Sequence, residues 1–130
     1  MDKIDVLKQI ISQFPHIKYK DELIQDICAD NIFGSGIEAK FLSLFLTRLK
    51  QINTFGYQAI TAVRNGFEKL TGAPGLYSMH IDLNNLNYRI LYTIDNKDHI
   101  LLLGFNEKAG KRVSDYTKPI SIAKQRLSRR

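Results

Sequence analysis

The sequence predicts an α+β fold in which amino-terminal helices pack on a small antiparallel β-sheet and one further helix closes the chain. Three observations predict this class. Apolar residues recur every three or four positions over residues 2–52, three short apolar segments separated by turns follow in residues 75–105, and helical spacing returns near residue 120. With 130 residues the chain has the length of one domain. We divide this domain into an amino-terminal helical extension (1–36) and a core (37–130).

The extension is predicted to hold two helices. Asp2 can cap the first helix and Pro15 ends it. The apolar stripe of this helix is formed by Ile4, Leu7, Ile11 and Phe14. A second helix starts near Asp21 and presents Leu23, Ile24, Ile27 and Cys28. Between the two helices, residues 16–20 fit either a linker or a short edge strand.

Residues 37–52 form the strongest predicted helix. Ser35 and Glu38 have the spacing of a capping box, in which each side chain satisfies a free backbone N–H at the helix start. One face of the helix collects the apolar side chains Ile37, Phe41, Leu44, Phe45, Leu49 and Ile52. A small sheet needs such a helix on one face to be stable. We therefore expect this helix to cover one face of the sheet and to leave the other face free for a ligand.

The segment between this helix and the sheet has two interpretations. Residues 53–56 form a turn, and residues 71–75 break the chain before the first long strand. Between them, a helical period runs through Tyr57, Ile60, Val63, Phe67 and Leu70. This period, weakened by Asn65-Gly66, fits either one helix or a helix that ends in an extended lead-in to the sheet.

Three strands are predicted at residues 75–82, 87–95 and 99–105. In the second, alternation places Tyr88, Ile90, Tyr92 and Ile94 opposite Arg89, Leu91 and Thr93. The turns between the strands are so short that neighbouring strands must be antiparallel, which predicts a meander to which a fourth edge strand can add. The third strand is apolar on both faces and is therefore expected at the centre of the sheet. The closing helix carries Ile120, Ile122, Ala123 and Leu127, with Pro119 in its first turn.

Composition limits the compartment and the partners. No apolar run approaches the roughly 20 residues of a membrane span, and the amino terminus lacks the layout of a signal peptide. The single cysteine, Cys28, cannot form an internal disulfide, in agreement with a reducing compartment. We therefore expect a cytoplasmic protein that does not associate with membranes.

The positive charge is concentrated at the carboxyl end. The net charge is +6; residues 1–64 hold eight Lys or Arg against seven Asp or Glu, whereas residues 108–130 hold eight against Asp115 alone. A segment of this kind attracts polyanions, of which nucleic acid is the commonest. The alternative is a solvated basic helix followed by a basic tail.

Several kinds of site are missing from the sequence. It has no Gly-rich phosphate loop, no dinucleotide fingerprint, and no pair of His or Cys residues at metal-ligand spacing. We expect neither a metal nor a small-molecule cofactor. The remaining candidates are basic and phenolic side chains on the strands or after them: Lys69, His80, Arg89, Lys108, Lys111, Arg112, Tyr116 and Lys118.

Arg89 is the most informative of these candidates. It interrupts an apolar strand, so its guanidinium must reach a carboxylate, water or a phosphate. An internal ion pair with Asp82 or Asp95 is the alternative to a phosphate. Simpler interpretations also exist for the others: a solvated loop for residues 108–112, a packing role for Tyr116 and a half-exposed strand position for His80. Together, these residue types suit RNA cleavage without a metal, because the reaction needs a base, an acid and a cation at the phosphate.

The order of residues resembles the RelE/HigB superfamily of type II toxin–antitoxin toxins, in its phage-derived HigB-like branch. The resemblance covers roughly residues 37–128. It rests on Phe67-Glu68-Lys69-Leu70-Thr71-Gly72, the strand from Gly75 to Ile81, Tyr88-Arg89-Ile90-Leu91-Tyr92, and the segment from Leu101 to Lys108. Each piece is weak alone, and the combination is more specific.

The resemblance implies a RelE-like fold and an mRNA endonuclease that acts on ribosome-bound mRNA and is neutralised by a cognate antitoxin protein. By position it implies that Arg89 contacts the scissile phosphate, that Lys108, Lys111 and Arg112 form a basic loop, and that Tyr116 is a catalytic tyrosine. Lys69 matches a basic residue before the sheet. With His80 and Lys118, Lys69 completes the expected RNA-binding set.

Two departures from the family pattern leave alternatives open. The family usually opens with a strand, whereas residues 1–36 precede the core here and could cover the sheet edge, mediate a dimer or occupy antitoxin-binding surface. The loop after the last strand also departs from the common form. The alternatives to a nuclease are a ParE-like gyrase inhibitor and an inactive nucleic-acid-binding relic whose added helices block the site.

Overall fold

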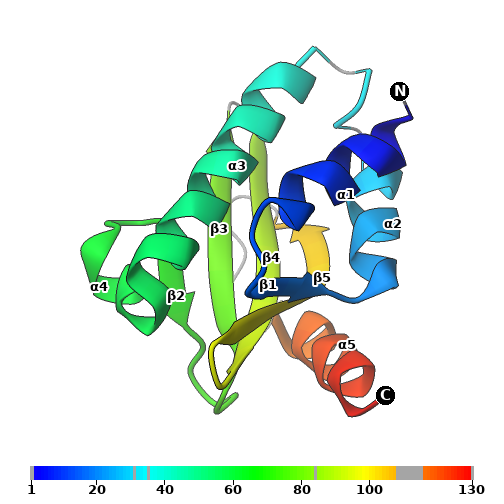
Figure 1. The fold of residues 1–130 in the computed structure, drawn as a ribbon. Helices are drawn as coiled ribbons and strands as arrows, with labels where there is room; N and C mark the ends of the chain where they lie inside the picture. Colours follow the sequence, from blue (N-terminus) through cyan, green and yellow to red (C-terminus); the bar gives the residue numbers. More distant parts are fainter. Residues whose placement is uncertain (1, 31, 35, 84, 108–115, 130) are drawn as a thin grey trace.

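The computed structural model describes residues 2–30, 32–34, 36–83, 85–107 and 116–129, and it has the expected α+β architecture (Figure 1). Along the chain the elements are α1 (Lys3–Ser12), β1 (Ile17–Tyr19), α2 (Asp21–Ala29), α3 (Glu38–Phe55), the 3-10 helix η1 (Gly56–Gln58), α4 (Ala59–Ala62), β2 (Phe67–Lys69), β3 (Tyr77–Leu83), β4 (Leu86–Asp95), β5 (Asp98–Asn106) and α5 (Thr117–Ser128). Within the described residues, no helix is long and apolar enough to cross a membrane.

Five strands of the described chain form one sheet, in the order β1-β5-β4-β3-β2. The meander of β3, β4 and β5 is antiparallel as predicted, and β1 joins β5 in parallel. The expectation that residues 99–105 lie at the centre is wrong, because β4 takes that place. Strand β5 is nevertheless apolar on both faces because helices cover both: α5 packs on one side, and Leu101 faces the core beneath α1–α3.

Residues 67–69 are the extended lead-in rather than a continuation of the helix. Helix α4 ends at Ala62, and Asn65 adopts a left-handed φ of 62°, which a helix cannot follow. Strand β2 then pairs antiparallel with β3, with Glu68 opposite Ser78. This turn makes β2 an edge strand of the sheet and places the Glu68 side chain beside His80 on β3.

The extension is part of the fold. Asp2 caps α1 by accepting a hydrogen bond from the Ile4 N–H, and α2 covers the predicted segment. Between them, β1 is the edge strand that one of the two interpretations predicted, so the extension covers the edge of β5. Apolar residues of α1 and α2 belong to the same core cluster as α3 and the sheet: Leu7, Ile11, Leu23, Ile24 and Ile27.

Helix α3 buries the predicted face but does not begin with the predicted cap. Phe41, Phe45, Leu49 and Ile52 are buried. The helix begins at Glu38, and the residue before it, Ile37, makes no side-chain cap, so a capping box does not start this helix. The Glu38 carboxylate instead accepts a hydrogen bond from the Gly34 N–H at 3.5 Å, and Ser35 lies outside the described residues.

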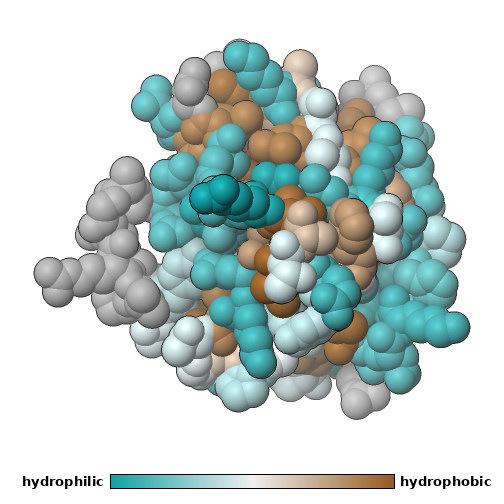
Figure 2. Space-filling model, turned by 90° about the vertical axis from the view of Figure 1, so that its left-hand side faces the viewer, coloured by the Kyte–Doolittle hydropathy of each residue, from teal (hydrophilic) through white to brown (hydrophobic). Residues whose placement is uncertain are grey.

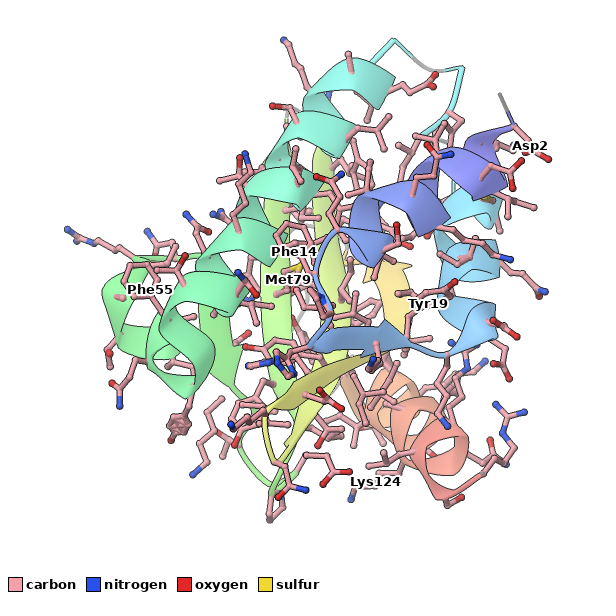
Figure 3. All side chains as sticks on the ribbon, in the orientation of Figure 1. Asp2, Phe14, Tyr19, Phe55, Met79 and Lys124 are labelled. Atoms are coloured by element: carbon pink, nitrogen blue, oxygen red, sulfur yellow. The ribbon has the colours of Figure 1, made fainter. Side chains whose placement is uncertain are left out.

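The sheet has two unequally covered faces. Alternation along β4 is as predicted, with Tyr88, Ile90 and Tyr92 beneath α1–α3 and Leu91 beneath α5. Phe14 and Met79 lie between the amino-terminal helices and the sheet (Figure 3). The side of the molecule at the left of Figure 1 shows a largely hydrophilic surface with smaller hydrophobic areas between the polar residues (Figure 2). On the second face, α5 packs mainly on β5 and leaves space beside β3 and β4.

Candidate active site

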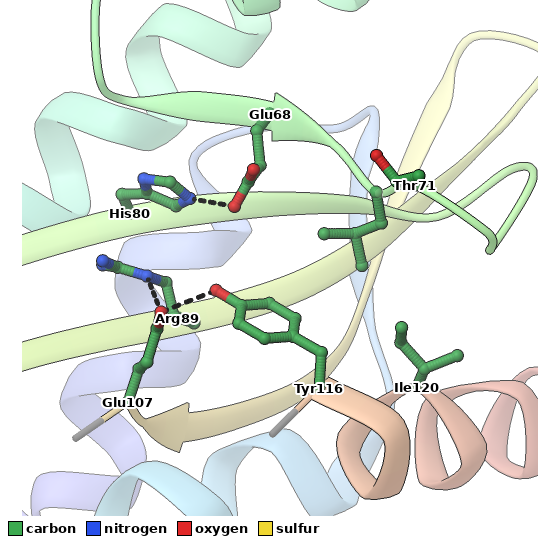
Figure 4. A pocket seen from close by; sticks show the side chains of 8 residues that line it. Glu68, Thr71, His80, Arg89, Glu107, Tyr116 and Ile120 are labelled. Carbon is green, nitrogen blue, oxygen red and sulfur yellow. Dashed lines mark hydrogen bonds and ion pairs between the residues drawn. The ribbon is translucent and has the colours of Figure 1, made fainter. Parts of the chain in front are cut away.

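A pocket of about 460 Å³ opens on this second face of the sheet. Its lining comes from β2, β3, β4, the residues after β5 and the start of α5: Glu68, Leu70, Thr71, His80, Arg89, Glu107, Tyr116 and Ile120 (Figure 4). None of these residues belongs to the extension. The proposal that the added helices block the site therefore has no support in the described residues.

Strand register brings the polar side chains together. His80 on β3 and Arg89 on β4 are direct cross-strand partners, and Arg89 is also opposite Phe105 on β5. The neighbours of Arg89 along the strand, Tyr88 and Ile90, are buried in the opposite face. Because side chains alternate along a strand, Arg89 must then point into the pocket.

His80 and Glu68 form a hydrogen-bonded pair. His80 Nε2 lies 2.9 Å from Glu68 Oε1, and this hydrogen bond is the main reason why the pKa of Glu68 is lowered. The position of His80 is fixed by its backbone. Its carbonyl accepts a hydrogen bond from Arg48 Nε at 2.7 Å, and its N–H donates to the Gly66 carbonyl at 2.8 Å. The pair therefore joins an imidazole to an ionised carboxylate at a defined place.

Arg89 is held by two carboxylates. Its Nε donates to Glu107 Oε2 at 2.8 Å and its Nη1 donates to Asp82 Oδ1 at 2.7 Å, while its side chain is only 12% exposed. Burial is the largest single influence and disfavours the charge, but the interactions with Asp82, Tyr116 and Glu107 together outweigh it, and the pKa of Arg89 is raised. The ion-pair alternative is therefore correct for Asp82 and not for Asp95. The third nitrogen, Nη2, makes no hydrogen bond within the described residues and remains available to an anion.

Tyr116 completes the set and shares a partner with Arg89. Its hydroxyl donates to Glu107 Oε2 at 2.7 Å, so one carboxylate oxygen receives both Tyr116 and Arg89. Its ring packs edge-on against Phe105, with 5.4 Å between centroids. Burial, followed by the hydrogen bond to Glu107, raises the pKa of Tyr116. The phenol is therefore protonated at neutral pH and can only act as a proton donor there.

The pocket brings together three of the predicted residues. His80, Arg89 and Tyr116 line it, whereas Lys69 and Lys118 are exposed and do not. The remaining candidates, Lys108, Lys111 and Arg112, lie outside the described residues. Two charged lining residues were missed, Glu68 and Glu107. The only signal for these two residues in the sequence was their position: Glu68 lies before the three predicted strands, and Glu107 directly follows the last of them.

The described lining does not carry an excess of positive charge. Arg89 and His80 face Glu68 and Glu107, and Asp82 also neutralises Arg89. The strongest basic segment of the sequence begins directly after Glu107, at Lys108. Within the described residues, no three or more His, Cys, Asp or Glu side chains are grouped as a metal site would require. The chemistry available in the pocket is therefore that of an imidazole–carboxylate pair, a guanidinium and a phenol.

Comparisons with protein-family models, with curated proteins and with solved structures found no significant match. The resemblance to the RelE/HigB superfamily thus remains a prediction from the sequence. The geometry of the pocket is the evidence on which a function can be proposed.

Proposed function

We propose that the protein is the toxin of a type II toxin–antitoxin system and a metal-independent endoribonuclease that cuts ribosome-bound mRNA in the cytoplasm. The observation that carries the proposal is that His80, Arg89 and Tyr116 line one pocket. An imidazole, a guanidinium and a phenol are a sufficient set for attack of a 2′-hydroxyl on the neighbouring phosphate. The partners in this proposal are mRNA, the ribosome and a cognate antitoxin.

His80 acts as the general base. Its imidazole accepts the 2′-hydroxyl proton while the 2′-oxygen forms a bond to phosphorus. The Glu68 carboxylate, 2.9 Å away, stabilises the imidazolium that results. A carboxylate that orients a histidine and balances its charge is a recurrent device of enzymes that deprotonate hydroxyls.

Arg89 stabilises the negative charge that develops on the phosphate. Its Nε and Nη1 are anchored to carboxylates, and Nη2 can donate to a non-bridging oxygen. An anchored guanidinium is already in place when the charge develops, so the site needs little reorganisation during the reaction. General attraction of RNA comes from the basic residues of 108–130, because the described lining is nearly neutral.

Tyr116 supplies the leaving-group proton. As the bond from phosphorus to the 5′-oxygen breaks, the Tyr116 hydroxyl gives its proton to that oxygen. The products are a 2′,3′-cyclic phosphate and a 5′-hydroxyl, and the proton held by His80 later returns through solvent. In Figure 4, His80 approaches Arg89 from the neighbouring strand β3, whereas Tyr116 approaches it from the start of α5, so the proposed base and acid come from different elements.

The test is to mix the purified protein with translating ribosomes and to map new mRNA 5′ ends. We expect new ends with the parent and with Arg64→Ala, a matched control because Arg64 is an exposed arginine outside the pocket. We expect no new ends with Arg89→Ala or His80→Ala. Intact message with the parent would contradict the proposal, as would equal cleavage by all four proteins.

One observation favours a non-nuclease toxin as the second candidate. Arg89 is paired with Asp82 and Glu107, as a purely structural arginine would be. A ParE-like inhibitor of DNA gyrase would need no catalytic set in the pocket. A supercoiling assay separates the candidates, because only the second predicts that the parent protein and Arg89→Lys inhibit gyrase.

A further inference from the structure

A second cavity, of about 300 Å³, lies at the opposite end of β4 and on the other face of the sheet. It is enclosed by the end of α3, η1, the start of β1 and the turn between β4 and β5. The residues that bear on its chemistry are His99, Tyr57, Asn53, Asn96, Lys97 and Ile94. It shares no lining residue with the candidate active site, so it requires its own explanation.

His99 is the central polar group of this cavity. Its side chain is almost fully buried, with 6% of the residue exposed, and neither ring nitrogen has a hydrogen-bond partner within the described residues. Burial lowers the pKa of His99, so the ring is neutral at pH 7. A neutral imidazole offers one N–H donor and one acceptor. Buried polar atoms without partners are rare in proteins, and His99 is one of the residues that line the cavity.

The other walls fit a flat aromatic ligand. Tyr57 is 48% exposed, and its ring contacts Tyr77 edge-on with 5.9 Å between centroids. Ile94 is an apolar wall of the cavity. Asn53 and Asn96 are exposed amides, and each has a donor and an acceptor. An aromatic wall combined with amide and imidazole groups is the usual chemistry for recognising an unstacked nucleobase, and asparagine pairs well with the edge of adenine.

The charge at the cavity mouth favours recognition of the base over recognition of a phosphate. Lys97 stands between Asp95 and Asp98 in the β4–β5 turn, and His16 Nδ1 lies 3.1 Å from Asp98 Oδ1. These charges nearly cancel, so a phosphate gains little there. We propose that this cavity binds an adenine base, presented either by a free nucleoside or nucleotide or by an unpaired nucleotide of a nucleic acid. The proposal goes beyond the nuclease function and does not depend on it, because binding is measured without cleavage.

The experiment titrates adenosine into the full-length protein with ¹⁵N-labelled histidine and follows the imidazole nitrogens by NMR. We expect a saturable shift of the His99 nitrogens while those of His80 stay unchanged. Tyr57→Ala should weaken binding about 5- to 150-fold, as loss of a stacking platform does. Phe55→Ala is the matched control, since Phe55 is an aromatic residue of the same region that is 44% exposed and does not line the cavity (Figure 3).

His99→Phe keeps a ring against Tyr92, whose centroid lies 5.9 Å from that of His99, and removes both nitrogens. The substitution should abolish adenosine binding. If His99→Phe does not fold, Tyr57→Ala still tests the cavity, because Tyr57 is exposed and its truncation should leave the fold intact. AMP should bind within about threefold of adenosine and with little dependence on salt. A deoxyadenosine hexamer distinguishes a free nucleotide from an unpaired nucleotide of a nucleic acid as the natural ligand. It lacks the 2′-hydroxyl and therefore cannot be cut by the proposed reaction. Tighter binding than AMP indicates a nucleic acid, and equal binding indicates a free nucleotide.

Three results would overturn the proposal. One is the absence of a saturable His99 shift with either adenosine or the hexamer at millimolar concentration. Another is an equal loss of affinity in Tyr57→Ala and Phe55→Ala. The third is AMP binding far tighter than adenosine with steep salt dependence, since that would identify a phosphate site.

Discussion

Tyr116→Phe separates the catalytic role of the phenol from its structural role. The substitution removes one hydroxyl and leaves the ring packed against Phe105. The lost hydrogen bond, 2.7 Å long, runs to a carboxylate, and bonds of that kind contribute about 1.5–3 kcal/mol to the free energy of unfolding. Glu107 Oε2 still receives Arg89 Nε, so the carboxylate is not left unpaired and the loss should lie at the lower end. For a domain of this size we expect Tm to fall by about 5–8 °C.

Tyr116→Phe should reduce the cleavage rate by far more than its modest effect on Tm would explain. Removal of a general acid typically slows a reaction by about 10²- to 10⁴-fold. The assay is single-turnover cleavage of ribosome-bound message at a temperature where melting curves show both proteins folded. Tyr19→Phe, on β1 outside the pocket, is the control and should keep both properties. Unchanged cleavage by Tyr116→Phe would refute the proton-donor role and leave Tyr116 as a packing residue.

Three further predictions concern stability. Burial raises the pKa of Tyr88, Tyr92 and Tyr116, so above pH 10 the folded chain holds protons that the unfolded chain has released. The free energy of unfolding, measured with urea, should therefore fall as pH rises above 10, by up to about 1.4 kcal/mol per tyrosine and pH unit. A free energy of unfolding that stays constant above pH 10 would contradict this prediction. Gly104→Ala would place a Cβ 2.5 Å from the Tyr88 hydroxyl and should lower the free energy of unfolding by about 1–3 kcal/mol. The double variant with Tyr88→Phe should recover part of this loss. A double-mutant cycle of denaturation measurements that shows no recovery would contradict the clash with the hydroxyl. Asp26→Ala would leave the half-buried Arg126 without its carboxylate partner, 2.6 Å away, and would remove an acceptor of the Gly104 N–H. Chemical denaturation should then show a free energy of unfolding lower by about 3–5 kcal/mol, and adding Arg126→Met should restore part of that loss.

Local patterns were sufficient to predict the longer helices and the faces of the strands. The stripes of α1 and α3 and the alternation along β4 depend on residues close in sequence, so they can be recognised without a structure. The edge strands could not be placed in the same way. β1 and β2 have three residues each, and their pairing with β5 and β3 depends on distant partners. The centre of the sheet was misassigned for that reason.

The candidate site was predictable only in part. Arg89 was recognisable because a charge interrupts an apolar strand, and its ion pair with Asp82 was one of the interpretations considered. Glu107 and Glu68 were missed because glutamate is common on protein surfaces and neither residue interrupts an apolar pattern. Their roles depend on register, which sets Glu68 beside His80 and Glu107 beside both Arg89 and Tyr116.

The chemistry of the cut ends tests the central claim most directly. If the pocket promotes attack by the 2′-hydroxyl, message cut on translating ribosomes must carry 2′,3′-cyclic phosphate and 5′-hydroxyl ends, and His80→Ala must lose these ends. Ends with a 3′-hydroxyl and a 5′-phosphate, or the same cyclic ends at an unchanged rate in His80→Ala, would contradict the assignment of His80 and Arg89 as the reactive set.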